Sequence, residues 1–128
     1  MDSFTLNDGC RMPKIGFGTW QIFDTKGGAD IVAQAIRAGY RHLDTASLYG
    51  SEGSVGEAWV GSGLPREDFF ITSKIWKDDL SATKARASLK KSLRLTRTEY
   101  LDLLLIHWPR RNAHDADWRQ RLAETWHA

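Results

Sequence analysis

Short apolar runs alternate along this chain with segments in which apolar residues recur at helical spacing. Four such runs, each followed by a loop of Gly, Ser, Asp or Pro, are found at 15–20, 42–45, 69–76 and 100–108. A helix between two strands carries the chain back to the starting edge, so consecutive strands of this kind pair in parallel. The alternation therefore predicts an α/β fold that is built on a parallel sheet.

The segments between and after these runs predict four helices. In the first, over 31–36, apolar residues recur at helical spacing, and Gly39 follows at the place of a C-cap. Ser81 is suited to cap the amino terminus of the third helix. The other predicted apolar faces are Val55, Ala58 and Trp59 in the second helix, Ala82, Ala85, Leu89 and Leu93 in the third, and Trp118, Leu122 and Trp126 in the fourth.

Length and charge limit the range of functions. The 128 residues fit one domain, and the formal net charge of +2 gives no strongly basic surface for nucleic acid or anionic membranes. The single cysteine, Cys10, excludes an intramolecular disulfide and leaves no metal-ligand spacing. The first residues lack the order of a signal peptide, and the apolar run 103–106 is far too short to span a membrane. We therefore expect a cytoplasmic protein without metal, nucleic acid or membrane partners.

Four reactive side chains follow the predicted strands at their carboxyl ends. Asp44, Lys74 and His107 each come at or near the end of a run, and Tyr49 lies on the loop after Asp44. This edge of a parallel sheet is where active sites form in α/β proteins. Taken singly, each residue also has a structural explanation: a turn residue, a lysine at a strand end, a core histidine and loop packing. Their shared position favours a common functional site.

The sequence around these residues resembles the aldo-keto reductase family. The segment GYRHLDTASLYGSE at 39–52 is similar to the first signature of that family, and LDLLLIHWP at 101–109 to its fourth-strand motif. The segments GFGTWQ at 16–21 and ITSKIW at 71–76 match the first and third strands. Ser51 stands where the family usually has Asn, which leaves the catalytic set intact.

The resemblance runs from about residue 5 to residue 109, and 97–109 is most similar to the bacterial 2,5-diketo-D-gluconate reductase branch. It implies the amino-terminal half of a (β/α)8 TIM barrel, about four βα units, preceded by a short β-hairpin at 5–12. Because such a barrel takes about 250 residues, residues 1–128 are expected to form a single, incomplete domain.

A half barrel would leave two sheet edges unpaired. It would also leave the inward faces of Phe17, Ile71 and Leu103 or Leu104 partly uncovered. Unpaired edges of this kind favour self-association.

The resemblance assigns the catalytic tetrad of the family to Asp44, Tyr49, Lys74 and His107. Carbonyl reduction needs a hydride, which the family takes from NADPH, and a proton, which Tyr49 would donate. A phenol with a pKa of about 10 becomes a useful acid only beside a cation such as Lys74, which can lower that pKa by on the order of one to three units. Asp44 would hold Lys74, and His107 would polarise the carbonyl.

The resemblance also implies binding residues. Trp20, Trp76 and Trp108, together with His107, would line the substrate pocket, although plain rim packing is the alternative for the three tryptophans. Thr19, Trp20 and Asp44 would contact NADPH, and most of its other contacts are expected beyond residue 128.

Three hypotheses of function remain open at this point. The first is an NADPH-dependent reductase of aldehydes and ketones, including keto-sugars, that works once the barrel is completed. The second is a truncated and catalytically silent chain, and the third is a half-barrel interaction module that does not bind NADPH alone. The isolated chain is expected to be inactive.

Overall fold

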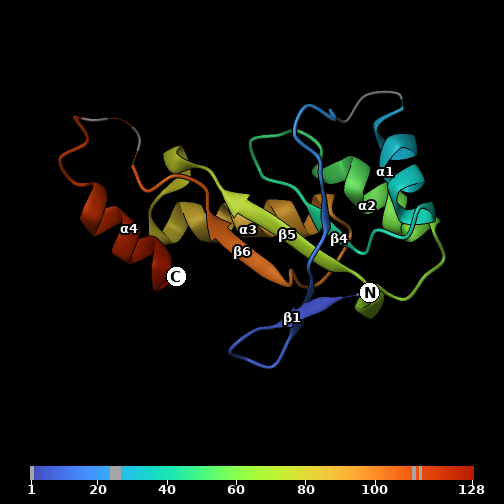
Figure 1. Ribbon diagram of the computed structural model, residues 1–128. Helices are drawn as coiled ribbons and strands as arrows, with labels where there is room; N and C mark the ends of the chain where they lie inside the picture. The colour runs from blue at the N-terminus through green and yellow to red at the C-terminus, as the bar shows by residue number, and fades with distance from the viewer. Residues whose placement is uncertain (1, 24–26, 111, 113) are drawn as a thin grey trace.

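The computed structural model describes residues 2–23, 27–110, 112 and 114–128. In this part of the chain a parallel sheet has four strands in the order β3-β4-β5-β6, and an antiparallel hairpin of β1 and β2 precedes it (Figure 1). The strands are β1 Ser3–Thr5, β2 Arg11–Pro13, β3 Gly16–Gly18, β4 His42–Asp44, β5 Phe70–Ile75 and β6 Leu103–Ile106. The predicted α/β class, parallel sheet and amino-terminal hairpin are confirmed.

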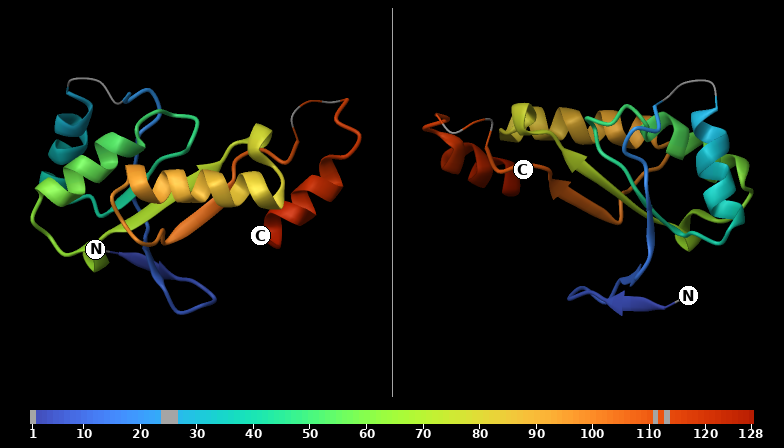
Figure 2. Two further views of the ribbon diagram at one scale, coloured as in Figure 1. Left: turned by 180° about the vertical axis from the view of Figure 1, so that it is seen from behind. Right: turned by 45° about the horizontal axis from the view of Figure 1, so that its top comes forward.

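Helices connect the strands of the parallel sheet. Figure 2 shows α1, α2 and α3 along one face of the sheet, while α4 lies beyond the edge formed by β6. The helices are α1 Gly28–Arg37, α2 Glu52–Gly61, α3 Ala82–Leu95 and α4 Trp118–Trp126, with the short 3-10 helices η1 Arg66–Asp68 and η2 Lys77–Asp79. None of the helices in the described part of the chain has the length and apolar character that crossing a membrane requires.

Two predicted helix ends are confirmed. Gly39 follows the C-cap of α1 with a left-handed φ of 101°, and its N–H donates to the carbonyl of Ile36 at 3.0 Å. A side chain with a Cβ would be strained at this φ, which explains the glycine. At the start of α3, the Ser81 hydroxyl accepts from the backbone N–H of Lys84 at 3.3 Å.

The buried face of α3 differs from the predicted one. Ala85 is buried as expected, but Ser88 and Ser92 are the other buried residues of this helix, and Leu89 and Leu93 are only half-buried. A search for apolar periodicity overlooks serine, although its side chain is small enough for a tightly packed helix face and its hydroxyl can bond to the preceding turn. The helix packs with this face toward its neighbours β5, α2 and α4.

The main core lies between the sheet and the helices. Leu43 of β4 and Ile71 of β5 are fully buried there, and Phe17 of β3 packs against the same cluster. Phe17 and Ile71 therefore face the helices, and the prediction that they point into the open barrel was wrong. Period-two alternation along each strand puts the flanking residues on the other face.

The opposite face of the sheet carries most of the polar residues of its strands. His42 and Asp44 alternate with buried Leu43 in β4, and Thr72 and Lys74 alternate with buried neighbours in β5. Two leucines of β6 lie on this face as well. Leu103, one of the two leucines predicted there, is in register with Thr72 and half-buried, and Leu105 is in register with Lys74 and 39% exposed.

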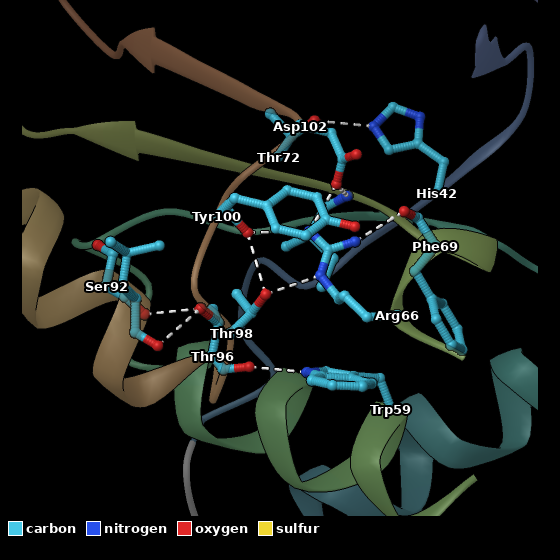
Figure 3. A network of polar contacts seen from close by, with 12 residues as sticks. His42, Trp59, Arg66, Phe69, Thr72, Ser92, Thr96, Thr98, Tyr100 and Asp102 are labelled. Atoms are coloured by element: carbon cyan, nitrogen blue, oxygen red, sulfur yellow. Dashed lines mark hydrogen bonds and ion pairs between the residues drawn. The ribbon is translucent and has the colours of Figure 1, made fainter. Parts of the chain in front are cut away.

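A polar network centred on Arg66 holds the segment before β6 against the start of β5 (Figure 3). The Arg66 guanidinium donates to the Asp102 carboxylate at 2.6 Å, to the Thr98 hydroxyl at 2.8 Å and to the Phe69 carbonyl at 2.8 Å. It also stacks on the ring of Tyr100, 4.1 Å from the centroid. Because Asp102 accepts from a backbone N–H of β5 as well, Arg66 and Asp102 together link the starts of the last two strands.

Replacing Arg66 with Ala should lower the free energy of unfolding by about 3 kcal/mol, because the shielded Asp102 carboxylate would lose its charged partner. The measurement is urea denaturation followed by circular dichroism. Arg94→Ala, at an exposed arginine in the last turn of α3, is the control and should change the midpoint little. Equal midpoints for both variants would show that the network contributes nothing to stability.

Candidate active site

The four predicted catalytic residues meet at one edge of the sheet. Asp44 is the last residue of β4, Lys74 is the second-last residue of β5, and His107 directly follows β6. Since the strands are parallel, these positions share the carboxyl edge, and Tyr49 reaches it from the loop between β4 and α2. The sequence alone predicted this convergence.

The ammonium group of Lys74 is at the centre of the site. It donates to the Asp44 carboxylate at 2.5 Å, to the main-chain carbonyl of Thr45 at 2.8 Å and to the Tyr49 hydroxyl at 3.4 Å. These three acceptors use all three protons of an ammonium. The Lys74 side chain is 12% exposed and that of Asp44 33%, so the ion pair is shielded on one side and open on the other.

The loop that carries Tyr49 is shaped by local backbone contacts. The N–H of Tyr49 donates to the carbonyl of Ala46 at 3.0 Å, which closes a tight turn. Gly50 then takes a left-handed φ of 64°, a conformation that favours glycine, and the chain enters α2. The Tyr49 ring is held between Trp20, with ring centroids 4.9 Å apart, and His107, 5.5 Å apart.

His107 is an uncharged neighbour of the phenol. Burial, and after it the charge of Lys74, hold the pKa of His107 below its usual value of 6.5, although Asp44 acts in the opposite direction. The ring is therefore neutral at pH 7. Its Nδ1 is buried without a hydrogen-bond partner among the residues that the structure describes.

An open pocket of about 360 Å³ lies in front of these groups. It is lined by Trp20, Leu48, Tyr49, Trp76, His107 and Trp108. All four predicted substrate-binding residues are in this set. Leu48 was not predicted, although a large apolar residue beside the predicted proton donor Tyr49 on a short loop is a signal that could have identified it.

The predicted cofactor residues differ in their access to solvent. Trp20 is 57% exposed and borders the pocket, and Asp44 is partly exposed. Thr19 is fully buried, and its hydroxyl donates to the Asp44 carbonyl at 3.1 Å. Because its side chain is enclosed, Thr19 offers no surface to a cofactor in this structure.

His42 does not join the site. Its Nε2 lies 3.0 Å from the Thr72 hydroxyl, and burial lowers the pKa of His42 below 6.5 against the influence of Asp44. In the ranges covered by the structure, three or more His, Cys, Asp or Glu side chains nowhere gather in an arrangement that could hold a metal ion.

The sequence and the structure of this chain are both similar to those of aldo/keto reductases. Residues 14–128 match the aldo/keto reductase family. Glyoxal reductase from Bacillus subtilis (strain 168) is 39% identical over 118 residues, which are 92% of this chain and 43% of that protein. The crystal structure of an aldo/keto reductase from Brucella melitensis has a TM-score of 0.89 and 40% identity, and the match covers 99% of this chain and 47% of that one.

An aldo-keto reductase from Bombyx mori that was solved in complex with NADP has a TM-score of 0.82 and 32% identity, over 98% of this chain and 44% of that one. The chain thus spans less than half the length of each of these proteins. Its parallel sheet corresponds to part of their TIM barrel, as the half-barrel prediction stated. By sequence and by structure, the chain belongs to the aldo/keto reductase family.

Proposed function

We propose that this chain carries the proton-transfer groups of an NADPH-dependent reductase of small aldehydes and ketones, with Tyr49 as the proton donor. The observation that supports this proposal most is that one ammonium, Lys74 Nζ, contacts both the Tyr49 hydroxyl and the Asp44 carboxylate. A carbonyl that gains a hydride becomes an alkoxide and needs a proton, and a phenol beside a cation gives one up more easily. Membership of the family supports the same reaction.

Each of the three central side chains has one task in this proposal. Tyr49 donates its proton to the carbonyl oxygen as the hydride reaches the carbon, so the product is a neutral alcohol and the protein keeps a phenolate. Lys74 stabilises that phenolate by its charge in a partly shielded site. Asp44 accepts from Lys74 and holds the ammonium against the phenol.

His107 would orient the carbonyl. A neutral imidazole has one N–H, and a proton on the enclosed Nδ1 would be a buried donor without an acceptor, the costlier of the two unpaired states. We therefore assign the proton to Nε2, from which His107 donates to the carbonyl oxygen and strengthens its bond as negative charge develops there.

NADPH, when bound, supplies the hydride. The exposed ring of Trp20 contacts the phenol, and the partly exposed carboxylate of Asp44 shares the Lys74 ammonium with it. Both suit a nicotinamide ring, whereas buried Thr19 does not. We assign the remaining contacts to the part of the barrel that the relatives have and this chain does not cover. The free thiol of Cys10 is exposed, as is usual in a reducing compartment, so we place the activity in the cytoplasm.

We also propose a substrate class, keto-sugars or small aldehydes. The likeness of 97–109 to the 2,5-diketo-D-gluconate reductase branch favours keto-sugars, and the name of the Bacillus subtilis relative is that of an enzyme acting on a small dialdehyde. Assays of a completed barrel with diketogluconate and with simple aldehydes separate these substrates. Equal or lower rates with the polar keto-sugar would contradict the keto-sugar proposal.

The test of the proposed function is a fusion protein. Residues 1–128 are joined to the part of Bacillus subtilis glyoxal reductase that this chain does not cover, and loss of NADPH absorbance is followed after an aldehyde is added. We expect turnover by the fusion and none by the chain alone, because positioning of the reactants supplies roughly 7–11 kcal/mol of a barrier reduction. A soluble fusion that binds NADPH without turnover would contradict the proposal.

A second candidate function is that of a half-barrel module that associates with a second copy. Within the described residues, β3 and β6 each pair on one side only. An apolar groove of about 690 Å³ lies beside β6, where it is lined by Leu105, Ile106, Trp118, Leu122 and Trp126, the last 78% exposed. Both edges belong to one parallel sheet, so the β6 edge of one copy can be continued in the same direction by β3 of another.

We expect the chain to sediment as a dimer or larger species at micromolar concentration, because unpaired parallel edges beside apolar surface favour association. Leu105→Lys, on the edge strand, should shift the population toward monomer, and Ile31→Lys, at an exposed position on α1, should leave it unchanged. A monodisperse monomer of the unmodified chain would rule this candidate out.

A further inference from the structure

Three buried hydroxyl groups form a chain beside the catalytic lysine. The Ser51 Oγ lies 2.8 Å from the Thr19 Oγ1 and 3.1 Å from the Thr45 Oγ1. All three residues are fully buried, at 0% exposure. They come from the end of β3, the end of β4 and the N-cap of α2, so the contact joins the β4–α2 loop to the end of β3, 32 positions before Ser51.

The number of available protons fixes the direction of these bonds. The Thr19 hydroxyl has one proton, and it donates this proton to the Asp44 carbonyl at 3.1 Å. Thr19 therefore accepts from Ser51, and Ser51, whose own proton is then used, accepts from Thr45. Ser51 is the central member, because it both donates and accepts, and hydrogen bonds in such a chain strengthen one another.

The two ends of this chain lie on consecutive residues, Asp44 and Thr45. The peptide group between them is held further by the N–H of Thr19, which donates to the Asp44 carbonyl at 2.9 Å, and by the Thr72 carbonyl, which accepts from the Thr45 N–H at 2.9 Å. These same two residues provide two of the three acceptors of the Lys74 ammonium, the Asp44 carboxylate and the Thr45 carbonyl.

We propose that Ser51 is a positioning residue for Lys74, and through Lys74 for the proton donor Tyr49. Ser51 touches neither residue's reacting group and acts by fixing the Asp44 and Thr45 backbone that holds the ammonium. The inference rests on the proposed function only for the role of Tyr49. Serine is suited to this position, where the family usually has Asn, because its hydroxyl can both donate to Thr19 and accept from Thr45.

The experiment follows the side-chain ammonium of Lys74 by ¹H–¹⁵N NMR in the full chain, with Lys74→Arg used to assign the signal. We expect a slowly exchanging ammonium in the unmodified protein. In Ser51→Ala its exchange with water should be about tenfold faster, as expected when one net hydrogen bond is lost. Ser51→Asn, which carries a donor and an acceptor, should restore slow exchange.

Ser92→Ala is the matched control, because Ser92 is also a buried serine, at 2% exposure, but lies on α3. In this variant the Lys74 ammonium should exchange with water at the same rate as in the unmodified protein, even if urea denaturation shows a loss of stability. Thr19→Val, nearly identical in shape, provides a second break in the chain if Ser51→Ala fails to fold, and it should also speed exchange.

Unchanged exchange in the Ser51 and Thr19 variants, or fast exchange in the unmodified protein, would overturn the inference. The readout needs no turnover, so it is separate from the test of the proposed function. If exchange changes as expected while the fusion protein is inactive, the proposed reaction fails and the positioning of Lys74 by Ser51 stands.

Discussion

Tyr49→Phe should lower the rate of carbonyl reduction by the fusion protein by about 10²- to 10⁴-fold, the usual contribution of a positioned general acid. The substitution removes one hydroxyl and keeps the ring, which packs between Trp20 and His107. Because the phenol donates a proton and does not hold the dinucleotide, NADPH affinity should stay nearly unchanged. Rates are measured by NADPH oxidation with an aldehyde, and affinity by fluorescence titration.

Tyr100→Phe is the matched control for this experiment. Tyr100 is 45% exposed and its ring stacks on Arg66, at the opposite end of the strands from the pocket. Removing that hydroxyl should leave the rate as it was. Full activity in Tyr49→Phe would refute the assignment of Tyr49 as proton donor, and equal losses in both variants would point to a general effect on folding.

Lys74→Met should lower the rate by about 10²- to 10³-fold, the cost of removing one group that stabilises developing charge. In the unmodified protein the Lys74 ammonium lies 3.4 Å from the Tyr49 hydroxyl. Without it, the phenolate that forms on Tyr49 after proton transfer would lose this cation. Asp44 would in addition become a partly shielded carboxylate without its ion-pair partner, 2.5 Å away in the unmodified protein. The assay is again NADPH oxidation by the fusion protein.

Lys90→Met, on the exposed face of α3, removes the same charge from the protein without touching the site and should leave the rate unchanged. A Lys74→Met fusion that remained folded and active would show that the ammonium is dispensable, and the mechanism would then need another source of stabilisation for the phenolate.

Apolar runs located the strands in the sequence but overestimated their length. The run 100–108 contains only four strand residues, Leu103–Ile106. In the residues before them, the Arg66 guanidinium binds the Tyr100 carbonyl and the Asp102 carboxylate, and the Asp102 N–H donates to the Ile71 carbonyl of β5 at 3.0 Å. An apolar run indicates which residues are buried. A strand also requires a neighbouring strand whose backbone pairs with it, and the sequence does not show where that neighbouring strand ends.

The sequence by itself determined which reactive side chains meet. Asp44, Lys74 and His107 follow parallel strands at their carboxyl ends, and parallel pairing brings such positions to one edge whatever the details of packing. That is why the strand pattern predicted these residues together with Tyr49 on the adjoining loop, whereas the aromatic pocket was implied by the resemblance to the aldo-keto reductases.

Only the tertiary structure decided how these side chains are held. The Lys74 ammonium depends on the carbonyl of Thr45, a group that every residue has and no sequence pattern marks. The contact of Ser51 with Thr19 spans 32 positions, and whether Phe17 faces the helices or the barrel changes with a shift of one residue in register. Contacts of this kind are set by backbone positions that arise only when the sheet and helices have packed, so they become visible only in the folded chain.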